Sequence, residues 1–153
     1  MAQLSFHSPI DDLTLSEENG RIVSLDWGWS PLSRETPFLR AAKELIDDYF
    51  DGLNPDFTLP LEPIGTNFQK KIWRAMCEIP YGETMAYGEI ADKVGSHPRA
   101  VGAACGRNPI PLLIPCHRVV GKKGKLIGYS GGNGIDTKRY LLDLEQATAQ
   151  KSR

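Results

Sequence analysis

The chain has 153 residues, of which 41 % are hydrophobic and 24 % are charged, and this suits a globular protein with one domain or two small ones. No apolar run approaches the roughly 20 residues that cross a bilayer, and the N-terminus lacks the basic start and apolar core of a signal peptide, so we expect a cytoplasmic protein without a membrane segment. The net charge is only −1, and three cysteines at spacings of 28 and 11 residues argue against a disulfide framework.

The first 30 residues alternate between apolar and polar side chains, as strands do. Leu4–Phe6 and Leu13–Leu15 are predicted strands, and an Asn-Gly turn joins the second of them to a predicted partner strand, Arg21–Trp27. Trp27 and Trp29 are interpreted as packing residues rather than as ligand contacts.

The period of the apolar residues becomes helical after Thr36. Thr36 can cap a helix, Pro37 suits its first turn and Gly52 suits its end. The apolar stripe of this helix consists of Phe38, Leu39, Ala42, Leu45, Ile46, Tyr49 and Phe50. The N-terminal part is therefore predicted to be a small sheet with a helix packed on it.

Three prolines between residues 54 and 63 predict an extended linker, which divides the chain into two predicted domains, 1–63 and 64–153. Residues 1–63 contain four Lys or Arg against twelve Asp or Glu, a balance of −8, whereas residues 64–153 contain fourteen against seven, a balance of +7. Such a basic half is typical of a surface that faces a polyanion, and DNA is the polyanion we expect.

A second helix is predicted to begin after Thr66 or Asn67 and to stop at Pro80. Its inward-facing side chains are expected to be Phe68, Ile72, Met76 and Ile79. Cys77 lies on the same helix and is interpreted as an inert core thiol.

Two short helices with a tight turn between them come next. The first predicted helix is Tyr87–Val94, which a glycine ends, and the second is Pro98–Gly106. Together they predict a helix-turn-helix. The second helix lacks the Asn and Gln side chains with which a major-groove reader contacts bases. Its small side chains, Ala100, Ala103 and Ala104 among them, instead favour close and sequence-independent contact with the minor groove.

The most informative motif is Ile114–Val120, in which Cys116 is followed directly by His117 and Arg118. A cation or an imidazole beside a thiol favours the thiolate, which is the nucleophilic form. A buried structural cysteine is the alternative, but three prolines stiffen the approach to this motif, and rigid loops of this kind usually present a functional group. The chain has no Cys-x-x-Cys and its three histidines are scattered, so no metal site is expected.

Beyond this loop, Gly121–Lys125 predicts a basic turn and a last helix follows Asp136. Four segments carry a resemblance to a known family, namely Gly106–Pro109, Ile114–Val120, Gly128–Gly132, and Leu141-Leu142 with Glu145. In that order they resemble the O6-alkylguanine-DNA alkyltransferases, the methylated-DNA–protein-cysteine methyltransferases. The resemblance runs from about Ile64 to Glu145, which is over half of the chain.

This resemblance implies a two-domain α/β fold. The N-terminal domain would be a ribonuclease H-like sheet and helix, and the C-terminal domain would be mainly helical, with a winged helix-turn-helix. The implied function is direct-reversal DNA repair, in which the alkyl group of O6-alkylguanine moves irreversibly to Cys116, once per molecule. No metal or diffusible cofactor is implied, and the partner is double-stranded DNA, bound by a monomer through its minor groove.

The resemblance also implies roles for particular residues. Cys116 is the acceptor, His117 is the base acting through a water, and Glu145 orients the imidazole, which is the logic of a catalytic triad applied to a thiol. Tyr87 matches the tyrosine that protonates the leaving guanine. Arg99 matches the arginine that fills the stack after the nucleotide is flipped out. The remaining matches are Val119, Tyr129 and Ser130 as walls of the guanine pocket, Asn108 as a tie between helix-turn-helix and cysteine loop, and Arg118 as a support of the fold.

Two departures from the family pattern concern loop lengths. The turn before Arg99 is about two residues shorter than the pattern leads us to expect, and the segment after Gly132 is about two residues longer. They bear on the pose of Arg99 and on the rim of the alkyl pocket. Cys105, on the helix that carries Arg99, has no expected role.

Three other functions stay open at this stage. A non-enzymatic damage sensor on the same scaffold would lack the acceptor cysteine, so Cys116 argues against it. A thiol hydrolase that uses Cys116 and His117 would turn over and would leave the uneven charge of the two halves unexplained. A helix-turn-helix regulator would protect a defined operator from cleavage.

Overall fold

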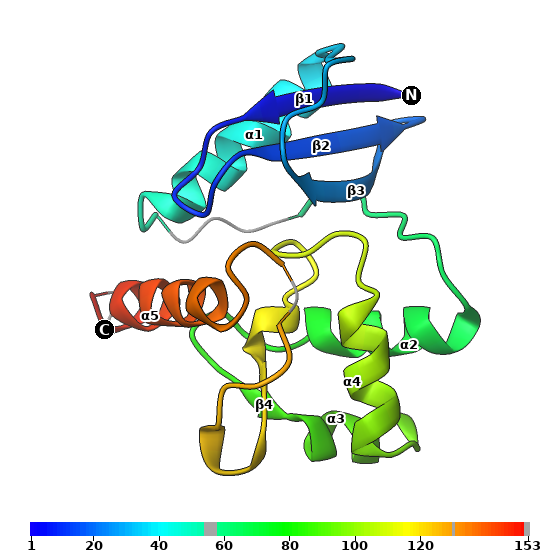
Figure 1. The fold of residues 1–153 in the computed structure, drawn as a ribbon, viewed down its shortest axis with the longest axis vertical. Coiled ribbons are helices and arrows are strands. Elements are labelled where there is room, and N and C mark those ends of the chain that lie inside the picture. The colour runs from blue at the N-terminus through cyan, green and yellow to red at the C-terminus, as the bar shows by residue number, and fades with distance from the viewer. Residues whose placement is uncertain (54–57, 130, 152–153) are drawn as a thin grey trace.

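The computed structural model describes residues 1–53, 58–129 and 131–151, and shows an α/β protein with a small antiparallel sheet and five helices (Figure 1). The sheet has the order β1 (Ala2–Phe6), β2 (Leu13–Glu18), β3 (Arg21–Trp27). Leu15 lies opposite Leu4 on one side and Leu25 on the other, so the apolar residues share one face of the sheet. The predicted strands are confirmed.

Helix α1 (Pro37–Phe50) covers this face of the sheet (Figure 1). The hydroxyl of Thr36 accepts a hydrogen bond from the backbone N–H of Leu39 at 3.1 Å, so the predicted cap and start of the helix are confirmed. The stripe is buried at Leu39, Ala42, Ile46 and Tyr49.

The C-terminal part lies below the sheet in Figure 1 and consists mainly of helices. Its elements are α2 (Asn67–Cys77), β4 (Met85–Ala86), α3 (Tyr87–Val94), α4 (Pro98–Gly106), η1 (Cys116–Arg118), β5 (Val119–Val120), η2 (Lys122–Gly124) and α5 (Ile135–Lys151). Strands β4 and β5 pair in parallel, and α3 packs against α4. The predicted short helices and the basic turn are therefore confirmed, and the last helix begins one residue earlier than Asp136.

Two predictions about α2 are wrong. Phe68 is 42 % exposed, because it lies in the first turn of the helix and the buried stretch begins only at Ile72. Cys77 is exposed, because the helix turns by about 100° from the buried Met76 to the next residue. Cys77 is therefore not a core thiol.

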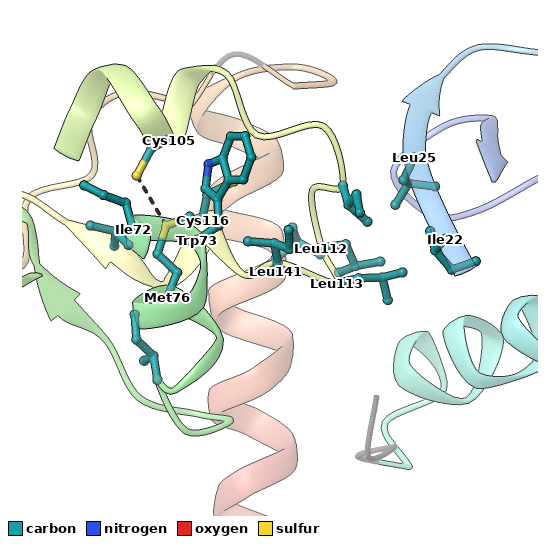
Figure 2. Packing of buried hydrophobic residues seen from close by; sticks show 14 of the residues in the cluster. Ile22, Leu25, Ile72, Trp73, Met76, Cys105, Leu112, Leu113, Cys116 and Leu141 are labelled. Atoms are coloured by element: carbon teal, nitrogen blue, oxygen red, sulfur yellow. Dashed lines mark hydrogen bonds between the residues drawn. The ribbon is translucent and has the colours of Figure 1, made fainter. Parts of the chain in front are cut away.

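Strand β3 joins the sheet to the C-terminal part. The N–H of Leu25 donates to the carbonyl of Pro109 at 2.9 Å, and Ile22 exchanges hydrogen bonds with the extended chain at residues 60–62. Figure 2 shows Ile22 and Leu25 pointing toward Leu112 and Leu113, so the hydrophobic core is continuous across this contact. Residues 54–57 of the predicted linker lie outside the described residues, and no helix within the described residues has the length and apolarity needed to cross a membrane.

Candidate active site

Cys116 begins a short 3-10 turn directly after Pro115 and is only 7 % exposed. The loop before it is fixed by Asn108, whose amide donates to the carbonyl of Ile114 and accepts from the N–H of Ile110, both at 2.9 Å. Burial raises the pKa of the Cys116 thiol, and a hydrogen bond with Asn108 and the charge of Lys138 oppose this rise. The resting sulfur is therefore a thiol, so a base must take its proton when it reacts.

His117 is fully buried and its Nε2 lies 2.6 Å from Oε2 of Glu145. Burial lowers the pKa of His117 despite the neighbouring carboxylate, so the ring is neutral near pH 7. Because the carboxylate accepts, Nε2 carries the ring proton and Nδ1 is left with a free lone pair. Nδ1 is buried and has no hydrogen-bond partner within the described residues. This nitrogen can therefore receive a proton.

Glu145 is a buried hub that accepts hydrogen bonds from three parts of the chain, one of them the backbone N–H of Gly82 to Oε1 at 3.5 Å. Arg118 donates two hydrogen bonds to this carboxylate, from Nε to Oε1 at 2.8 Å and from Nη2 to Oε2 at 3.1 Å. Its Nη1 donates a third hydrogen bond, to the carbonyl of Ile79 at 2.9 Å. The hydroxyl of Tyr49, on α1, donates to Oε2 at 2.6 Å. Burial alone would raise the pKa of Glu145, but the hydrogen bonds and charges of His117 and Arg118 bring it down to about 2.

We expect this hub to make the free energy of unfolding fall in acid. The folded pKa of Glu145 lies below its ordinary value of 4.5, at about 2, so its ionised form stabilises the fold above pH 4.5 and this stability is lost as the pH falls through 2. His117 acts in the same direction, because its folded pKa lies below the ordinary 6.5 and its neutral form stabilises the fold above that pH. The Glu145 contribution is about 3 kcal/mol.

Denaturant unfolding at several pH values between 7.5 and 2 measures this loss. Glu145→Gln should flatten the dependence on pH, whereas Glu83→Gln, at an exposed carboxylate, should leave it unchanged. The same slope in Glu145→Gln as in the parent protein would contradict the role of this carboxylate.

Lys138 is a third buried charge, after Arg118 and Glu145, and the sequence did not single it out. Its Nζ donates to the carbonyl of Ile127 at 2.8 Å and lies 5.6 Å from the ring centroid of Tyr87. The hydroxyl of Tyr87 donates to the same carbonyl at 3.2 Å. Burial lowers the pKa of Lys138, whereas its electrostatic interactions with Cys116 and Cys105 raise this pKa. The ammonium therefore lies close enough to favour a thiolate at Cys116.

A small cavity of about 60 Å³ lies at the sulfur. It is lined by Trp27, Cys105, Gly106, Asn108, Pro111, Cys116, Gly128, Tyr129 and Gly131. The hydroxyl of Tyr129 is buried and has no hydrogen-bond partner within the described residues. Val119 is fully buried next to the cysteine turn and does not line the cavity, and Ser130 lies outside the described residues.

Cys105 shares this cavity with Cys116. It donates a weak hydrogen bond to Sδ of Met76 at 3.4 Å, drawn as the dashed line in Figure 2. Burial, together with the nearby Cys116, raises the pKa of Cys105 to about 12. Its thiol is therefore unreactive. Within the described ranges, no group of three or more His, Cys, Asp or Glu could hold a metal ion.

A larger cleft of about 640 Å³ opens between α3, α4 and the turn that contains η2. Tyr87 lines it from the start of α3 and the exposed Arg99 lines it from the start of α4. Ala103 is exposed and Ala100 partly so, whereas Ala104 is only 2 % exposed and its carbonyl accepts a hydrogen bond from Trp73. The structure thus places Ala104 in the core, because its side of α4 packs against α2.

Comparisons with known proteins agree on one family. The sequence model described as "6-O-methylguanine DNA methyltransferase, DNA binding domain" matches residues 67–147. The methylated-DNA–protein-cysteine methyltransferase of Methanosarcina barkeri is 44 % identical over 91 % of this chain and 93 % of its own length. The constitutive enzyme of that name from Bacillus subtilis is 42 % identical over 91 % of this chain and 92 % of its own.

The fold agrees with solved structures as well. The crystal structure of Mycobacterium tuberculosis OGT in complex with DNA has a TM-score of 0.87 and 41 % identity, covering 97 % of this chain and 94 % of that one. The structure of the O6-methylguanine methyltransferase from the same organism has a TM-score of 0.86. With a matching family model over more than half of its length and relatives above 40 % identity over nine-tenths of it, the chain belongs to the O6-methylguanine DNA methyltransferase family.

Proposed function

We propose that this protein repairs O6-alkylguanine in double-stranded DNA by moving the alkyl group, methyl in the first instance, to Sγ of Cys116. The bond between O6 and the alkyl carbon breaks, a thioether forms, and guanine leaves with the electrons of the broken bond. The observation that carries the proposal is the buried thiol next to an imidazole whose Nε2 is held by Glu145 and whose Nδ1 is free to accept a proton.

The proposed proton path uses groups already in place. Nδ1 of His117 takes the thiol proton through a water, and the carboxylate of Glu145, which Arg118 holds in position, stabilises the imidazolium that results. Lys138 stabilises the thiolate electrostatically. Tyr87, whose pKa is raised by burial and which therefore keeps its proton, donates to the departing guanine and regains a proton from the relay.

Binding to DNA is proposed to use α3 and α4 as a helix-turn-helix, with η2 and the β4–β5 pair as the wing. The exposed Ala103 permits close approach to the minor groove, and Arg99 fills the stack that the flipped nucleotide leaves. The +7 balance of residues 64–153 supplies attraction to the phosphates. Residues 1–63 would form the ribonuclease H-like domain of a cytoplasmic monomer.

Stoichiometry tests the proposal. With excess duplex that carries alkyl-labelled O6-methylguanine, we expect at most one label per protein molecule, on the peptide that contains Cys116, because no group among the described residues of the site is placed to hydrolyse a thioether. The label is counted after proteolysis by mass spectrometry. Cys116→Ser is the matched control and should take up none. Sustained turnover would favour a thiol hydrolase, and binding without transfer would favour a damage sensor.

A further inference from the structure

Trp27, the last residue of β3, is the one side chain of the N-terminal sheet that lines the cavity at Cys116. Its indole N–H donates to the carbonyl of Ile10 at 2.8 Å, which fixes the ring in its plane. The indole meets the ring of Tyr129 edge to face, with centroids 6.4 Å apart and an interplanar angle of 88°. Trp27 is thus held from its own sheet and contacts a wall of the cavity.

The loop that leads into α5 lies directly against this indole. A Cβ added to Gly131 would stand 2.5 Å from two carbon atoms of the ring, and one added to Gly132 would stand 2.9 Å from Nε1. Gly131 does not adopt a left-handed φ, so its requirement for glycine is spatial rather than conformational. The position of the loop is therefore set by the tryptophan.

The same indole separates two spaces. On one side is the cavity of about 60 Å³ that Cys116 lines. On the other is an open surface depression of about 720 Å³, lined by Asp11, Asp12, Trp27, Gly28, Gly131 and Gly132. Trp27 and Gly131 line both spaces and so form the wall between them.

We propose that Trp27 sets the upper size of the alkyl group that Cys116 accepts. The cavity, of about 60 Å³, is small, so a methyl or an ethyl group should fit it more readily than a benzyl group. A longer group would need the space that the indole occupies. This inference rests on the proposed role of Cys116 as acceptor, and it makes a residue of the N-terminal sheet a determinant of substrate range.

The test compares two adducts in the same duplex, O6-methylguanine and O6-benzylguanine, by their second-order rate constants of transfer. In Trp27→Ala the benzyl-to-methyl ratio of rate constants should rise by about tenfold or more, because the lost wall joins the cavity to the outer depression. Trp29→Ala is the matched control, since this tryptophan is two residues away and 53 % exposed, and the ratio should stay as in the parent protein. An unchanged ratio in folded Trp27→Ala overturns the proposal.

A second variant tests the contact from the loop side. Gly131→Ala places a methyl group against the indole and should slow transfer of both adducts, whereas in a Trp27→Ala background the same substitution should have little effect. If the double variant is slowed by the product of the two single-variant factors, the two residues act independently, and this would overturn the claim that Trp27 positions the loop.

Should Trp27→Ala fail to fold, Trp27→Phe keeps an aromatic wall of smaller size and should shift the ratio in the same direction by less. An unchanged ratio there also overturns the proposal. Failure of the proposed function is distinguishable, because the parent protein would then transfer neither adduct to Cys116.

Discussion

Replacing His117 with alanine is expected to slow alkyl transfer by about 10²–10⁴-fold, the usual contribution of a positioned general base. The reason is the state of the thiol. Burial raises the pKa of Cys116, so at neutral pH the sulfur holds its proton until a base removes it. Nδ1 of His117 is the free basic nitrogen next to the cysteine, and Glu145 holds the ring in the tautomer that leaves this nitrogen free.

Single-turnover rates on duplex with O6-methylguanine measure this effect. The affinity for undamaged duplex should change little, because His117 is fully buried and does not line the cleft between α3 and α4. His117→Gln is a second variant whose amide can still donate to Glu145 but cannot serve as a base, so it should fold and remain slow. His7→Ala, at an exposed histidine, is the control. An unchanged rate in His117→Ala would remove this residue from the mechanism.

Replacing Arg99 with alanine is expected to slow alkyl transfer from duplex DNA much more than transfer from a free alkylated base. Transfer from duplex DNA should slow by about 10–10³-fold, because extruding a nucleotide costs a few kcal/mol and the gap in the stack is then unfilled. Transfer from free O6-methylguanine should change by no more than about twofold, since a free base leaves no gap. The exposed position of Arg99 at the start of α4, on the rim of the cleft that Tyr87 also lines, is what motivates the expectation.

Arg107→Ala is the matched control for charge, because Arg107 is exposed at the other end of α4. Both variants lose one positive charge and should show a similar drop in salt-dependent affinity for undamaged duplex. The selective loss on duplex substrate should appear in Arg99→Ala alone. Equal slowing on duplex and free base would mean that Arg99 supports the fold or the pocket, and would withdraw its role in the stack.

Local patterns in the sequence were enough to predict most of the helices and strands. The alternation over residues 2–27, the Thr36 cap and the Asn-Gly turn predicted the sheet and α1, because each depends on neighbours a few residues apart. The burial of Phe68 and Cys77 was predicted wrongly. The apolar period does not show at which turn of a helix neighbouring elements begin to bury it, nor how wide the buried face is.

The parts of the site that the sequence missed depend on contacts between distant segments. Tyr49 looked like one more member of an apolar stripe, and only the packing of α1 near α5 brings its hydroxyl to Glu145. Trp27 was interpreted as a packing residue, and nothing near it in the sequence points to Cys116. Lys138 did leave a signal, because it precedes Leu141, Leu142 and Glu145 at helical spacing and so shares their buried face.

The bond from Tyr49 to Glu145 spans 96 residues, and the bond from His117 to Glu145 spans 28. During folding, each of these contacts closes a long loop of the chain. The chain loses conformational entropy when the loop closes, before the hydrogen bonds of the network can stabilise it. We therefore expect the hub to form late, after the helices and the three-stranded sheet. A partly folded chain would carry the Cys116 thiol without an oriented base beside it. Alkyl transfer then reports that both ends of the chain have reached their native positions.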